Sequence, residues 1–86
     1  MDCWIGITQE QDRHVVRLAG ELRRAEVPDL LQACAGISRQ QLTINLADLV
    51  SADFAGLDAL RRLRREGAAL VAVAEYIRMK LDSQTA

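Results

Sequence analysis

The chain has 86 residues, half of them apolar, and its eleven basic and twelve acidic residues give a net charge of −1. A chain of this length builds one core, so we expect a single domain over residues 1–86, ordered from about residue 3 to about residue 81. The nearly neutral charge excludes a general electrostatic attraction to nucleic acid or to an anionic membrane surface.

The first predicted elements are two strands and a helix. Trp4–Thr8 and His14–Ala19 are rich in β-branched residues, and Gln9–Arg13 between them is polar, a pattern typical of an antiparallel hairpin. Pro28 suits the first turn of the helix that follows, and Gly36 suits its C-terminal cap. This helix has one apolar stripe, formed by Val27, Leu30, Leu31 and Cys34.

The next elements are a strand and a capped helix. Gln41–Leu46 alternates apolar and polar residues as a half-buried strand does, and we expect residues 47–52 to form a loop. Asp53 is the best N-cap for a helix from about Phe54 to Glu66, because its carboxylate accepts hydrogen bonds from the free N–H groups of the first turn. Gly67 ends this helix. Its buried face is marked by Leu57, Leu60 and Leu63.

The last elements are a strand and a short helix. Ala68–Val73 is apolar on both sides of the pleat, as in an interior parallel strand. We expect a helix from Glu75 to about Leu81 with Ile77 on its buried side, and fraying over residues 82–86. The order ββαβαβα predicts an α/β domain, in which about three helices pack on a mixed, mainly parallel four-stranded sheet.

No group of residues fits a catalytic or metal site. His14 is the only histidine and lies in a predicted strand without a nucleophile motif nearby, so we expect a strand-surface side chain. One histidine with the separated Cys3 and Cys34 cannot supply a zinc set, and no glycine-rich phosphate loop is present. Asp48 and Asp53 occupy a predicted loop and an N-cap, both ordinary places for aspartate. We therefore expect no enzyme activity, no metal and no cofactor.

The second predicted helix carries a dense set of arginines, namely Arg61, Arg62, Arg64 and Arg65. Asp58 lies one turn before Arg62, in the order that favours an ion pair on a helix surface. The simpler interpretation is a solvated helix face. The alternative is a cationic rim that orients an acidic partner protein, because complementary charge raises the rate and specificity of encounter.

Three segments together carry a family resemblance. They read LAGEL at 18–22, LTINLADL at 42–49 and DFAGL at 53–57. In this order and spacing they resemble the bacterial sulfate-transporter and anti-sigma-factor-antagonist (STAS) domain, which shows a G-E-L after its second strand and a D-S-S-G-L or D-S-A-G-L turn at its second helix. The resemblance implies a STAS-like fold and a non-enzymatic, cytoplasmic protein-interaction module. No apolar run approaches the ~20 residues of a membrane span, so we expect no direct membrane insertion.

The resemblance also implies a site that has lost its switch. In STAS anti-sigma factor antagonists, a kinase that is also the anti-sigma factor phosphorylates the serine after the aspartate. Here that position is Phe54, Ala55 also departs from the pattern, and Asn45 stands where the family usually has aspartate. Ser51 is nearby, but its offset argues against modification. The pattern is kept at Asp53, Gly56 and Leu57.

The expected function is therefore binding to a kinase-like anti-sigma factor without phosphorylation control. Phe54 is either an exposed aromatic anchor or an inward-facing core residue. We expect the partner surface to comprise Ser51, Asp53, Phe54, Ala55, Gly56, Leu57, Asp58, Arg61 and Arg62.

Three other possibilities stay open. The shorter form of the domain also resembles the STAS scaffold subunit of bacterial phospholipid-transport ABC systems, so the alternative function is a scaffold subunit of such a transporter or of a larger signalling assembly. Some STAS domains bind nucleotides or apolar ligands, although no site for either is evident here. Many STAS domains continue beyond the third helix. If the strand Leu70–Val73 is consequently at the sheet edge, its unpaired backbone groups favour a homodimer.

Overall fold

The computed structural model describes residues 3–83, and it begins with the predicted hairpin. Strands β1 (Cys3–Glu10) and β2 (Arg13–Leu22) pair antiparallel over eight consecutive residue pairs. The strands are longer than predicted, and the turn shrinks to two residues, of which Gln11 has a φ of 54°. A positive φ of this kind lets a two-residue turn follow the twist of the strands.

Helix α1 (Val27–Cys34) follows a short 3₁₀ turn at Arg24–Glu26. Its predicted stripe is confirmed, because Leu30 and Cys34 are fully buried and the other two stripe residues are partly buried against the core. Gly36 has a φ of 82° just after the helix, the left-handed conformation expected there.

Strand β3 (Leu42–Ala52) runs parallel to β2 and is much longer than predicted. The loop expected at residues 47–52 is wrong, since this segment continues the strand. Two register shifts place extra residues in β3 opposite β2. Its buried residues Leu46, Leu49 and Ala52 therefore recur every third position. Bulges of this kind break the two-residue alternation by which a strand is recognised in a sequence.

Helix α2 (Phe54–Arg65) begins at the predicted N-cap, Asp53, and ends one residue earlier than predicted. Gly67 follows the helix with a φ of 119°. The predicted buried face is confirmed, with Leu57, Leu60 and Leu63 at 3% exposure or less.

The C-terminal elements are short. Strand β4 comprises only Ala69–Val71, pairs parallel with β3 and lies at the edge of the sheet. The strand is parallel as expected, but its interior position is wrong, and the alternative position at the sheet edge is confirmed. It is shorter than predicted because Ala72 has a φ of 56° and breaks the extended backbone. Helix α3 (Glu75–Ser83) is two residues longer than predicted and buries Ile77 as expected. Residues 84–86, where fraying was expected, lie outside the described residues.

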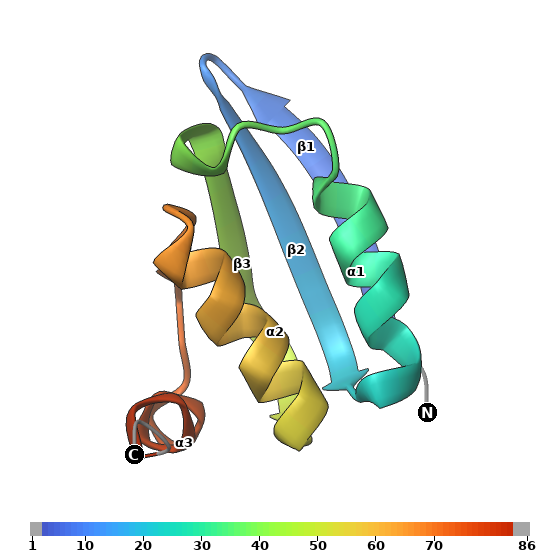
Figure 1. The fold of residues 1–86 in the computed structure, drawn as a ribbon, viewed down its shortest axis with the longest axis vertical. Coiled ribbons are helices and arrows are strands. Elements are labelled where there is room, and N and C mark those ends of the chain that lie inside the picture. Colours follow the sequence, from blue (N-terminus) through green and yellow to red (C-terminus); the bar gives the residue numbers. More distant parts are fainter. Residues whose placement is uncertain (1–2, 84–86) are drawn as a thin grey trace.

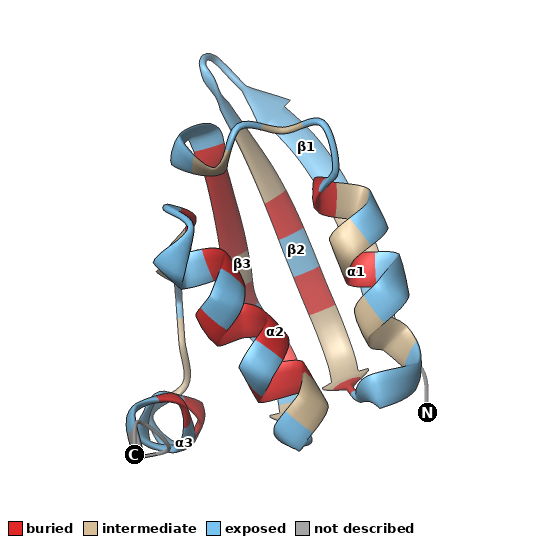
Figure 2. Cartoon of the chain, in the orientation of Figure 1, coloured by how far each residue is buried: buried red, intermediate tan, exposed pale blue. Residues whose placement is uncertain are grey.

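The predicted packing of helices on a mixed, mainly parallel four-stranded sheet is confirmed, and the helices and the sheet form two layers (Figure 1). The sheet order is β1-β2-β3-β4, and α1 and α2 lie side by side on one of its faces (Figure 1). Figure 2 shows that the buried residues are concentrated in α2 and in the central strands β2 and β3. Leu18 and Ile44 of the two central strands are almost completely buried there. Within residues 3–83, no helix has the length and apolar character needed to cross a bilayer.

Candidate functional site

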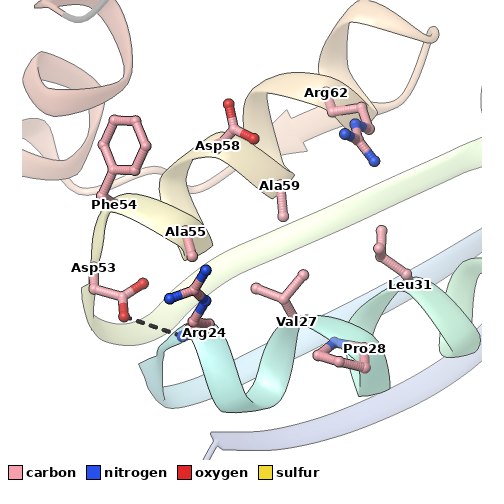
Figure 3. A pocket seen from close by; sticks show the side chains of 10 residues that line it. All are labelled: Arg24, Val27, Pro28, Leu31, Asp53, Phe54, Ala55, Asp58, Ala59 and Arg62. Atoms are coloured by element: carbon pink, nitrogen blue, oxygen red, sulfur yellow. Dashed lines mark hydrogen bonds between the residues drawn. The ribbon is translucent and has the colours of Figure 1, made fainter.

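The start of α2 is fixed by the Asp53 carboxylate. One oxygen, Oδ1, accepts a hydrogen bond of 2.8 Å from the backbone N–H of Gly56. The other, Oδ2, accepts one of 3.0 Å from the N–H of Arg24, which is drawn in Figure 3. The bond from Gly56, aided by the one from Arg24, lowers the pKa of Asp53, although partial desolvation acts in the opposite direction. Asp53 therefore caps α2 and ties it to the turn that leads into α1.

Gly56 lets α2 approach the end of β2 closely. A Cβ atom at this position would lie 2.4 Å from the backbone oxygen of Leu22. That same oxygen accepts a hydrogen bond of 3.1 Å from the N–H of Asp53. Gly56 and Leu57 are buried. They hold the start of α2 in place but do not belong to its exposed surface.

Phe54, the first residue of α2, is exposed. Its side chain projects from the helix on the side away from α1 (Figure 3), and 66% of the residue is accessible to solvent. Of the two alternatives left open by the sequence, the inward-facing core residue is wrong. Burial normally stabilises a phenylalanine by about 1.5–3 kcal/mol, and here that stabilisation is left unused.

A groove of about 660 Å³ runs between α1 and α2 beside Phe54. Ala55 and Ala59 point toward α1, and Val27 and Leu31 point back toward α2, so the floor is apolar (Figure 3). The complete lining is Arg24, Val27, Pro28, Leu31, Asp53, Phe54, Ala55, Asp58, Ala59 and Arg62. We call this groove, whose lining includes the exposed Phe54 and Asp58, the α1–α2 surface.

The arginines of α2 do not form one face. Arg61 is only 8% exposed, and its Nη1 donates a hydrogen bond of 3.3 Å to the backbone oxygen of Leu81 in α3. Arg64 lies 3.6 Å from the Asp82 carboxylate, also in α3. The expected solvated face, or cationic rim, is thus wrong for Arg61, because the packing of α3 covers this side of α2.

Asp58 and Arg62 both lie at the α1–α2 surface but do not pair. Asp58 points away from α1 and Arg62 points toward it (Figure 3). The ion pairs of residues 3–83 do not include these two side chains. The ion pair expected from their spacing is wrong. Both residues are exposed, and their charges face solvent at different sides of the helix.

The remaining residue of the expected surface, Ser51, is half-buried in β3 and pairs with Glu21 of β2. The sequence reasoning missed the part of the groove that α1 supplies. Val27 and Leu31 were assigned to the core stripe, and Arg24 was not considered. No signal in the sequence separates a groove-lining apolar residue from a core residue on the same helical stripe.

The residues considered for chemistry are dispersed. His14 is half-buried rather than on the surface, and its Nδ1 has no hydrogen-bond partner among residues 3–83. Asp48 lies in β3 at 3.9 Å from Arg17. Burial raises the pKa of the Cys34 thiol. In the described part of the chain, no three histidine, cysteine or acidic side chains gather as a metal site would require.

Comparison with known proteins identifies the fold. The sequence matches no protein-family model and no curated protein. The structure is similar to the anti-sigma factor antagonist SpoIIAA in its unphosphorylated form, with a TM-score of 0.68 and 20% identity over 93% of this chain and 82% of that one. It is also similar to an antisigma-factor antagonist STAS domain from Rhodobacter sphaeroides, with a TM-score of 0.61 and 22% identity over 96% and 94%.

A larger protein contains the same arrangement. The crystal structure of Mglu matches with a TM-score of 0.66 and 22% identity, over 81% of this chain but 20% of Mglu. This chain therefore spans about a fifth of the length of Mglu. Taken together, the similarities confirm the predicted STAS-like fold.

Proposed function

We propose that this chain, which has the fold of the anti-sigma factor antagonists, is a non-enzymatic cytoplasmic module that binds a kinase-like anti-sigma factor through its α1–α2 surface. The observation that carries the proposal is the exposed Phe54 at the first residue of α2. Large aromatic side chains supply much of the binding energy in protein interfaces once a partner covers them.

The surroundings of Phe54 fit the role of an anchor. The bond between Asp53 and Gly56 fixes the first turn of α2, so little conformational freedom is lost when a partner binds. The apolar floor beside Phe54 offers further area to bury, and the charges of Asp58 and Arg62 lie at its margin. An apolar centre with a charged margin is the usual composition of a transient interface.

The same residue makes the proposed binding constitutive. Phe54 has no hydroxyl group, so phosphate cannot be added at the position that is phosphorylated in STAS antagonists. Ser51 is half-buried in a paired strand, where a kinase cannot seat it as an extended substrate. The module therefore stays competent for binding whatever the activity of its partner.

The test is an affinity capture from the source cytoplasm, followed by mass spectrometry. We expect wild-type protein to retain a kinase-like anti-sigma factor and Phe54→Arg to lose it, because the charge cannot enter an apolar pocket. Met79→Arg is the matched control, since Met79 is 62% exposed on α3, outside the groove. It should retain the partner.

Three results would contradict the proposal. If Phe54→Arg still retained the partner, the partner would not bind through the α1–α2 surface. Capture of a permease and a transport ATPase in place of a kinase would identify the chain as a transporter scaffold. Phosphate on Ser51 of the wild-type protein after incubation with the captured kinase would show that binding is switched.

A further inference from the structure

Strand β1 forms an unprotected edge of the sheet. It pairs only with β2 and has no strand on its outer side within residues 3–83. Alternate residues of an edge strand point their N–H and C=O groups outward, where another strand can pair with them. Soluble proteins usually protect such an edge with a short strand, a bulge, a proline, a lysine or a covering loop.

β1 has none of the protective features that belong to a strand's own length, register and sequence. The strand is eight residues long, and its register with β2 is unbroken. Its sequence, CWIGITQE, contains no proline, lysine or arginine, and its only charge is Glu10 at one end. At the opposite edge, β4 has only three residues and is stopped by the φ of 56° at Ala72. The edge expected to self-associate from the sequence is thus the better protected one.

Apolar side chains are exposed on both faces of the sheet along β1. Trp4 is 62% exposed and lies over Gly6, where a Cβ atom would be 2.4 Å from the indole ring. Ile7 is 53% exposed on the opposite face, the one that carries the helices. There a shallow groove of about 430 Å³ is lined by Cys3, Ile5, Ile7, Asp29, Gln32 and Ala33, the last three from α1.

We propose that β1 pairs antiparallel with β1 of a second copy of this chain, forming a continuous eight-stranded sheet. A twofold axis perpendicular to the sheet relates two antiparallel edge strands, so one pairing satisfies both open edges at once. The same axis places both α1 helices on one face, where each flanks the groove of the other copy. The two Glu10 side chains then lie at opposite ends of the seam and do not repel one another.

A second copy fits this edge better than an isolated peptide. β1 spans eight residues, about 27 Å at the rise of an antiparallel strand, and the groove beside it adds lining residues from α1. A twofold contact buries this strip on both copies at once. A single extended peptide would cover the strand but leave the groove beside α1 open.

The wild-type chain should form dimers of twice the 9.5 kDa monomer mass in sedimentation equilibrium, between roughly 1 and 100 µM, the range of weak homodimers. Ile7→Lys should weaken the dimer at least about tenfold, because a lysine on the edge blocks pairing. Val50→Lys is the matched control, since Val50 is a β-branched strand residue with 61% exposure but lies in β3. It should dimerise as the wild type does.

Two measurements on the wild type need no variant. Trp4 is the only tryptophan, so its emission should shift to the blue as the concentration rises. Hydrogen exchange should slow in Cys3–Glu10 on dimerisation but not in Ala69–Val71. A monomer at every concentration, an equal loss of dimer in the control, or protection confined to β4 would each overturn the proposal. The β1–β1 contact does not include Phe54. A result that overturns the dimer therefore leaves the proposed partner binding intact, and loss of partner binding leaves the dimer intact.

Discussion

At the scale of single residues, the α1–α2 surface depends on two positions at the start of α2, the buried Gly56 and the exposed Asp53. Gly56 and Asp53 both contact the backbone of Leu22, the last residue of β2, which lies against the start of α2. Gly56 permits the close approach of α2 to the end of β2, and the N–H of Asp53 donates a hydrogen bond to the Leu22 oxygen. Their contribution is to position Phe54, which lies between them in the chain.

Gly56→Ala should lower stability. Alanine in a helix is normally about 0.5–1 kcal/mol more favourable than glycine. Here its Cβ would lie 2.4 Å from a backbone oxygen that cannot rotate away, and such overpacking typically costs about 1–3 kcal/mol. Urea unfolding monitored by circular dichroism gives the free energy of unfolding. A variant as stable as the wild type, or more stable, would show that the contact between α2 and β2 relaxes freely.

Asp53→Ala should also be destabilising, and its effect should depend on pH. Loss of an N-cap costs about 0.5–2 kcal/mol. The backbone bond from Gly56 lowers the pKa of Asp53 below its ordinary value of 3.8, so the folded state favours the ionised carboxylate. The stabilisation is therefore complete well above 3.8 and is lost as the pH falls through the folded pKa.

The measurement is the difference in unfolding free energy between wild type and Asp53→Ala, at neutral pH and in acid. It should shrink in acid. Asp58→Ala is the control, because within residues 3–83 the side chain of Asp58 accepts no hydrogen bond. A difference that stays constant with pH would show that the charge of Asp53 does not contribute to the cap.

At the scale of elements, α3 is attached to the domain through α2. Arg61 donates to the backbone of Leu81, Arg64 approaches Asp82, and Ile77 and Leu81 are buried. Two of the four clustered arginines thus contact α3, of which Arg61 is the buried one. The sequence alone does not distinguish the arginines that contact α3 from those that face solvent.

Arg61→Ala should destabilise the fold by about 1–3 kcal/mol, because it removes a buried donor and leaves the Leu81 carbonyl without that bond. Arg62→Ala should change stability by no more than about 0.5 kcal/mol, since Arg62 is exposed. Denaturant midpoints of the two variants, with hydrogen exchange of α3, make the comparison. Equal effects would mean that the bond to Leu81 contributes nothing measurable.

At the scale of the whole molecule, the two proposed surfaces lie on opposite sides of α1. Its residues Val27 and Leu31 line the groove toward α2, whereas Asp29 and Gln32 line the groove beside β1. A dimer formed through β1 would therefore leave the α1–α2 surface of each copy open. The exposed aromatic Phe54 and the unprotected edge strand are separate features, which is why each can be tested without the other.

Local sequence determined a large part of this protein. The hairpin, the cap at Asp53, the buried stripe of α2 and the order of elements could all be predicted, because turn chemistry, capping and periodicity are properties of neighbouring residues. Together with the spacing of the three motifs, they predicted a STAS-like fold. That Phe54 stands at the position of the family's phosphorylated serine stays a prediction from the resemblance.

Only the tertiary structure decided the rest. The direction of Phe54, the burial of Arg61, the bulged continuation of β3 and the groove between α1 and α2 each depend on contacts between segments far apart in the chain. Arg24 and Asp53, for example, are 29 residues apart and meet through one hydrogen bond. Periodicity says that a face is apolar, but packing decides whether another element covers that face or leaves it open to a partner.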